Sequence, residues 1–129
     1  VAHCGAHGGQ LMRPNTHIQD ITDLYLWLLD RPAETVTYNA GFENLSVSAT
    51  ADLISQSVQA EVTVSEVPDK RSYCVDSSKL LKAGFEPQFD VADAIAEIAA
   101  AYREGILDTS DKAINLKWMR QNGMVRDVR

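Results

Sequence analysis

The segment DVADAIAEIAAAYREG, residues 90–105, constrains the fold most strongly, because it has the complete signature of an amphipathic helix. Asp90 is a good N-cap residue, and Gly105 supplies a left-handed stop. Apolar residues recur between them at helical spacing: Val91, Ile95, Ile98 and Tyr102. The pattern therefore predicts a helix over residues 90–105.

Shorter strand and helix patterns alternate before this segment. QLMRPN is an extended piece that Pro14 keeps out of helical geometry. DITDLYLWLLDRP predicts a helix that Asp20 caps and Pro32 ends. The β-branched and aromatic residues of 35–41 and the alternation over 60–67 predict two strands.

Three further helices are predicted. One begins after Ser46 or Ser48, and one begins after Asp76 or Ser77 and ends at Gly84. A last helix covers about residues 110–121. The fold class is therefore α/β, with a small two- or three-stranded sheet and several flanking helices, which is more helix than such a sheet needs for cover.

The domain organisation follows from the same patterns. Residues 1–9 are predicted to be a loose N-terminal segment, 10–107 the α/β domain and 108–129 a C-terminal helical extension. His3, Cys4 and His7 offer three zinc ligands, but a closed structural site needs four, so we predict no metal site. Cys4 and Cys74 form no CxxC pair, and without a signal peptide a reducing cytoplasm is expected.

Composition narrows the function classes. The net charge is −6, and no basic face is evident, which argues against nucleic acid as a partner. The longest apolar run, LYLWLL, is too short to cross a bilayer, so no membrane partner is predicted.

Two catalytic signatures are missing. The glycine cluster GAHGG lacks the spacing and the preceding strand of a dinucleotide-binding fingerprint. No tyrosine is followed four residues later by lysine. The sequence therefore predicts no cofactor bound by this chain and no catalysis by it alone.

Three motifs, in order, resemble one enzyme family. RPNTHIQD, TYNAGFENLSV and DKRSYCVDSSKLLKAGFEP are similar to segments of the extended short-chain dehydrogenases, the NAD-dependent epimerase/dehydratase family of sugar-nucleotide enzymes. The resemblance covers roughly residues 9–105 and concerns only the C-terminal, substrate-binding lobe. NAD and the catalytic tyrosine belong to the Rossmann lobe of that family, which has no counterpart here.

The resemblance implies a ligand and four residues that bind it. In the family, two arginines approach the pyrophosphate of a nucleoside diphosphate sugar, and they correspond to Arg13 and Arg71. Asn44 and Tyr73 fall at positions where some members contact the ligand. Planar guanidinium groups suit this role because they bind phosphate oxygens in pairs.

Each of these residues also has an ordinary structural interpretation. Arg13 can pair with Asp20 or Asp23, and Arg71 can be a solvated loop charge. Asn44 suits a turn or cap, and Tyr73 suits packing. His17 is expected to be structural at the strand-to-helix junction, and Lys79 to be solvated.

The alternative function is a self-associating structural module with a non-functional ancestral site. DLYLWLL and INLKWM are the apolar stretches that a homo-oligomer or a missing Rossmann lobe would cover. They can equally close the domain's own core.

Overall fold

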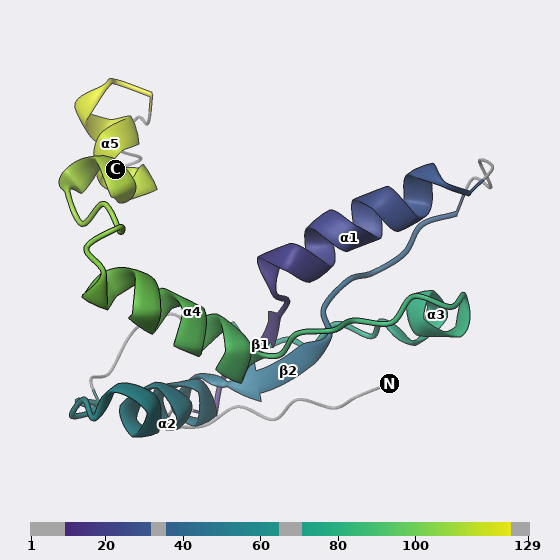
Figure 1. The fold of residues 1–129 in the computed structure, drawn as a ribbon, viewed down its shortest axis with the longest axis horizontal. Coiled ribbons are helices and arrows are strands. Elements are labelled where there is room, and N and C mark those ends of the chain that lie inside the picture. Colours follow the sequence, from purple (N-terminus) through teal and green to yellow (C-terminus); the bar gives the residue numbers. More distant parts are fainter. Residues whose placement is uncertain (1–9, 32–35, 65–70, 125–129) are drawn as a thin grey trace. The chain divides into compact units, whose positions relative to one another are not determined.

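A computed structural model describes residues 10–31, 36–64 and 71–124 (Figure 1). The chain divides into two compact units, Val1–Glu97 and Ile98–Arg129. In its described part, the first unit contains a two-stranded sheet, helices α1 to α3 and the beginning of α4. The second contains the end of α4, a 3-10 turn and α5. The small α/β fold class predicted from the sequence is confirmed.

The sheet consists of two short antiparallel strands, β1 (Met12–Asn15) and β2 (Glu43–Ser46). Arg13 is paired with Leu45, and Pro14 with Asn44. The segment that follows residue 70 lies against β1, because the Tyr73 N–H donates to the Met12 carbonyl over 3.3 Å. Met12 in turn donates its own N–H to Ser72 Oγ over 3.0 Å.

The two strands predicted at 35–41 and 60–67 are not strands in their described parts. Residues 36–41 are irregular. Side chains, and not a backbone ladder, connect them to the neighbouring chain. For example, Thr16 Oγ1 donates to the Ala40 carbonyl over 3.4 Å. Residues 60–64 are all exposed. Their alternating pattern therefore lacks the buried face that stabilises a strand.

Helix α1 (Ile18–Leu29) begins before the predicted cap. His17 is the N-cap, and its Nδ1 accepts the N–H of Gln19 over 3.2 Å. Asp20 lies in the first turn and is almost fully buried, with 1% of its surface exposed. The cap prediction was wrong because the Asp20 carboxylate binds a segment distant in sequence, as described below.

Helices α2 (Val47–Val58) and α3 (Ser78–Lys82) begin where the sequence places them. Ser46, the first of the two candidate caps, accepts the N–H of Ala49 over 3.0 Å. Asp76 accepts the N–H of Ser78 over 2.9 Å at the start of α3. Gly84, with φ of +96°, supplies the predicted left-handed stop.

Helix α4 (Val91–Arg103) has the predicted ends. The Asp90 and Asp93 carboxylates each accept the other's backbone N–H, over 2.9 and 3.0 Å, which is a reciprocal cap. Gly105 follows with φ of +70°. The single helix predicted over 110–121 is instead a 3-10 turn, η1 (Asp111–Ala113), and a short helix, α5 (Asn115–Gln121), separated by the extended Ile114.

The core of the first unit is small and aromatic. Leu24, Leu80 and Phe85 are buried, and the side chains packed against them are Trp27, Tyr38, Ala40 and Phe42. The Trp27 ring meets Phe85 edge-on at 5.8 Å, and Phe42 stacks on Phe85 at 5.5 Å. This core connects α1, α3 and residues 38–42, so it fixes the loops that lead into the sheet.

Candidate functional site

The candidate site is a cluster of Arg13, Arg71 and Tyr73. The Arg13 guanidinium donates to the carbonyl of Met12 over 2.9 Å and also to the carbonyl of Arg71. Its Cζ lies 5.6 Å from the centroid of the Tyr73 ring, within the range of a cation–π contact. Three of the four residues that the resemblance indicates are therefore neighbours, although Arg13 and Arg71 are separated by 58 positions.

The strand β1 determines this arrangement. It places Arg13 one residue after Met12, whose backbone N–H and C=O bind Ser72 and Tyr73. The segment that carries Arg71 is thereby held beside the strand that carries Arg13. Arg71 is exposed, and 52% of the Tyr73 surface is accessible. The cluster can therefore meet a ligand from solvent.

The predicted alternative partners of Arg13 are occupied elsewhere. Asp20 accepts the backbone N–H groups of Gln88 and Phe89 over 2.8 and 3.3 Å. Asp23 Oδ1 accepts a hydrogen bond from the Gln19 side-chain amide over 2.9 Å. The packing interpretation of Tyr73 is not favoured either, since half of its surface is exposed.

Asn44 has a different position from the other three. Its Nδ2 donates to the carbonyl of Val75 over 3.0 Å, and its Oδ1 accepts the Val75 N–H over 2.8 Å. The side-chain amide thus binds the Val75 backbone as a neighbouring strand would. A ligand contact by Asn44 stays a prediction, and it requires the amide to exchange one of these bonds.

Further side chains hold the segment after residue 70 against residues 36–44. Ser77 is buried, and its Oγ accepts the Gly41 N–H over 2.8 Å and donates to the Gly41 carbonyl over 3.1 Å. Ser77 occupies the N-cap position of α3 without capping it. Lys79, expected to be only solvated, donates to the Thr37 carbonyl over 3.0 Å. The order of these pairs, 44 with 75, 41 with 77 and 37 with 79, makes the two segments antiparallel.

Gly41 is required at the closest approach of these segments. A Cβ atom at this position would lie 2.8 Å from Cβ of Val75 and 3.1 Å from Cβ of Pro14. The sequence pattern placed this glycine at the end of the strand predicted over 35–41 and did not indicate the close approach. The signal for it is a glycine within a β-branched and aromatic segment.

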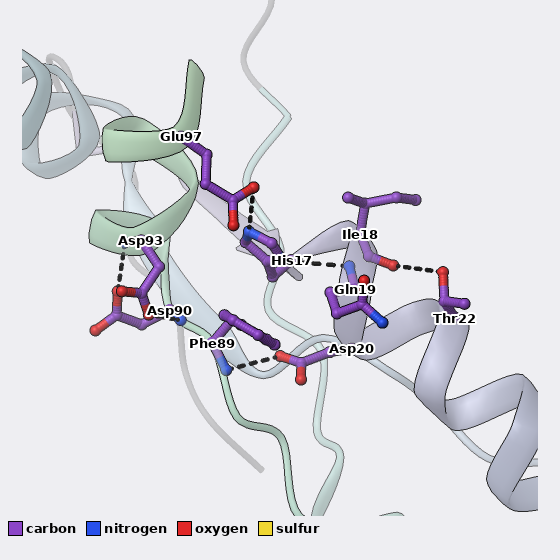
Figure 2. Close-up of polar contacts among 9 residues, drawn as sticks. All are labelled: His17, Ile18, Gln19, Asp20, Thr22, Phe89, Asp90, Asp93 and Glu97. Atoms are coloured by element: carbon purple, nitrogen blue, oxygen red, sulfur yellow. Dashed lines mark hydrogen bonds and ion pairs between the residues drawn. The ribbon is translucent and has the colours of Figure 1, made fainter. Parts of the chain in front are cut away.

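A second polar cluster joins the start of α1 to the start of α4 (Figure 2). Figure 2 shows His17 between Gln19 and Glu97. Its Nε2 lies 3.4 Å from Oε2 of Glu97. The His17 ring stacks on Phe89, with centroids 4.7 Å apart. Asp20 binds the backbone beside it, as described above. His17 thus occupies the strand-to-helix junction where a structural role was predicted.

Two carboxyl groups have shifted pKa values. Hydrogen bonds from Ser78, through its side chain and its backbone, lower the pKa of Asp76. The corresponding bonds from Ser110 lower the pKa of Asp108. Both groups are exposed, and both bind the backbone two residues further on, which is typical of Asx turns.

Cys74 lies between Tyr73 and Val75, and it is disulfide-bonded. Cys4, with the other candidate zinc ligands His3 and His7, lies outside the described residues. Disulfides persist mainly in oxidising compartments, so this bond does not favour the reducing environment predicted from the sequence. In the part of the chain that the structure describes, no group of three or more His, Cys, Asp or Glu side chains is placed to hold a metal ion.

No helix within residues 10–31, 36–64 and 71–124 combines the length and the apolar character needed to cross a bilayer. Comparison of the chain with protein-family models, with curated proteins and with solved structures gives no match.

Proposed function

We propose that this chain is the substrate-binding lobe of a sugar-nucleotide epimerase/dehydratase-like protein. It binds a nucleoside diphosphate sugar at Arg13, Arg71 and Tyr73, and it does not catalyse a reaction by itself. The observation that carries the proposal is the contact of the Arg13 guanidinium with both the Arg71 backbone and the Tyr73 ring.

The chemistry of the cluster suits a diphosphate. Two guanidinium groups on adjacent segments can bind oxygens of both phosphates, and such charge-assisted bonds are the stronger kind. The accessible Tyr73 ring offers an apolar surface next to these charges.

The residues of this chain do not fit a nicotinamide cofactor. The glycine fingerprint that lets the backbone approach a pyrophosphate is missing, as is a tyrosine followed four residues later by lysine. The proposal therefore includes no hydride transfer. NAD would belong to the Rossmann lobe of a complete family member.

Isothermal titration calorimetry with UDP, dTDP and their glucose conjugates tests the proposal. We expect saturable binding that Arg71→Ala weakens about 10- to 100-fold, the range for losing hydrogen bonds to charged groups. Arg71 is the better position to truncate, because Arg13 also supports the backbone. Arg103→Ala, which removes an exposed arginine at the end of α4, is the matched control and should bind normally. Absence of heat with every ligand would overturn the proposal.

The outer face of α1 favours the second candidate, a self-associating structural module. Ile18, Tyr25 and Leu29 are 73%, 67% and 81% exposed and lie on one side of the helix, away from the buried Leu24. Trp27, in contrast, packs on the core, so a charge there would disrupt folding rather than association.

Sedimentation velocity distinguishes this candidate from the first. A module of this kind should be a concentration-dependent oligomer that Leu29→Glu converts to a monomer. Val64→Glu is the control, because Val64 is a comparably exposed apolar residue away from α1. A wild-type protein that is monomeric at all concentrations would exclude self-association.

A further inference from the structure

His17 connects two helices through opposite sides of one imidazole ring. Nδ1 accepts the N–H of Gln19 and so caps α1, while Nε2 lies 3.4 Å from the carboxylate of Glu97 in α4 (Figure 2). An imidazole nitrogen that accepts a hydrogen bond carries no proton, so the neutral ring has its proton on Nε2. Only one of the two neutral tautomers can form both contacts.

We propose that His17 is a proton-sensitive cap that binds both helices when neutral and only α4 when protonated. A second proton must go to Nδ1, because Nε2 already has one. The Nδ1–H would then face the Gln19 N–H, donor against donor, and the cap bond is lost. The contact with Glu97 becomes an ion pair at the same time. The protonated ring therefore loses its hydrogen bond to α1 and binds α4 more strongly.

The surroundings of the ring favour this direction of change. The side chain of His17 is 3% exposed, and Phe89 covers one face of its ring, so the ring has little room to find another acceptor for Nδ1–H. The hydrogen-bonding carboxylates of this cluster are Asp20 on α1, Glu43 on β2, Asp90 before α4, and Asp93 and Glu97 on α4. Glu97 on α4 has the ion-pair contact with the ring, at 3.4 Å, so protonation strengthens the attraction of the ring to α4.

Two measurements by NMR on the full chain test the proposal without any nucleotide, so the result is independent of the proposed function. The ¹⁵N shifts of the imidazole report which nitrogen carries the proton, and amide exchange reports the cap. We expect Nδ1 to be the unprotonated nitrogen of the neutral ring. As the ring gains its second proton, the protection of the Gln19 amide should fall roughly fivefold, as for loss of an N-cap. The backbone N–H of Gln88, which donates to Asp20 Oδ1 over 2.8 Å, is the internal reference. It should keep its protection from exchange.

Two variants, His17→Asn and Glu97→Gln, test separately the titration of the ring and the charge of its partner. Asparagine caps helices well and does not titrate, so Gln19 protection in His17→Asn should be constant between pH 5 and 8. Glu97→Gln keeps an acceptor for Nε2–H and removes its charge, and its cap should still open on protonation. The proposal is overturned if the neutral ring has its proton on Nδ1. It is also overturned if wild-type Gln19 stays protected while the ring becomes doubly protonated, a comparison that needs neither variant to fold.

Discussion

The side chain of Asn44 forms two hydrogen bonds with the backbone of Val75, one to its carbonyl and one from its N–H. This pair connects β2 to the segment that carries Arg71 and Tyr73. It has the geometry of two paired strand residues, with a side chain in place of one backbone.

Asn44→Ala should therefore destabilise the fold. The substitution leaves both backbone groups of Val75 without these partners in a half-buried position, which costs about 1–3 kcal/mol. Urea denaturation followed by circular dichroism measures the change. Asn39→Ala, which removes a single longer bond of 3.4 Å to the Asp76 carbonyl, is the control and should have a smaller effect.

Gly41→Ala should destabilise the protein by overpacking. The new methyl group would lie 2.8 Å from Cβ of Val75, and forcing such contacts costs about 1–3 kcal/mol. Val75→Ala in the same chain removes Cγ1, 3.0 Å from that methyl, and should recover part of the loss. A double-mutant cycle that gives purely additive effects would contradict this contact.

Gln59→Gly should stabilise the end of α2. Gln59 is the C-cap residue and has φ of +54°, a left-handed conformation that glycine adopts without strain. We expect a gain of about 0.5–1 kcal/mol in the free energy of unfolding. Gln56→Gly, inside the same helix, should instead lose about 1 kcal/mol. Equal signs for the two substitutions would be inconsistent with the left-handed cap.

The lowered pKa of Asp76 predicts a pH dependence. Ser78 stabilises the ionised carboxylate in the folded chain, so its contribution is fully present above the unfolded-state pKa of about 4. The contribution is lost as the pH falls through the lower folded-state pKa. Wild type should be more stable than Asp76→Asn at pH 7, and the two should converge near pH 3 or below. Parallel stability curves over this range would argue against the Ser78 bonds as the cause.

Cys74 should resist alkylation until a reductant is added, because it is disulfide-bonded. Mass spectrometry of the peptide that contains residue 74, after iodoacetamide treatment with and without dithiothreitol, measures this directly. Labelling of the unreduced, folded protein would show that the thiol is free and would restore the prediction of a reducing environment.

Local signals predicted most of the helices correctly, and tertiary contacts explain the errors. Ser46, Asp90 and Gly84 act through bonds or angles within a few residues, which a linear pattern can detect. Asp20 looked like a cap because its residue type suits one, but its partners are 68 and 69 positions away.

The distinction between local patterns and contacts distant in sequence also applies to the candidate site. The motif resemblance indicated Arg13, Arg71 and Tyr73 together, whereas no periodicity in the sequence connects residues so far apart. It did not indicate that the amide of Asn44 binds Val75, because that bond depends on how β2 meets a segment 31 positions away.

The segment that follows residue 70 is held to residues 37–44 by individual side chains, those of Asn44, Ser77 and Lys79, and not by a continuous backbone ladder. A regular third strand would tolerate most substitutions on its neighbour, since every residue type offers the same backbone groups. Here the residue types at positions 41 and 44 help to determine where Arg71 and Tyr73 lie. Substitutions at Gly41 or Asn44 can therefore displace Arg71 and Tyr73, and so alter the proposed site, without contacting a ligand themselves.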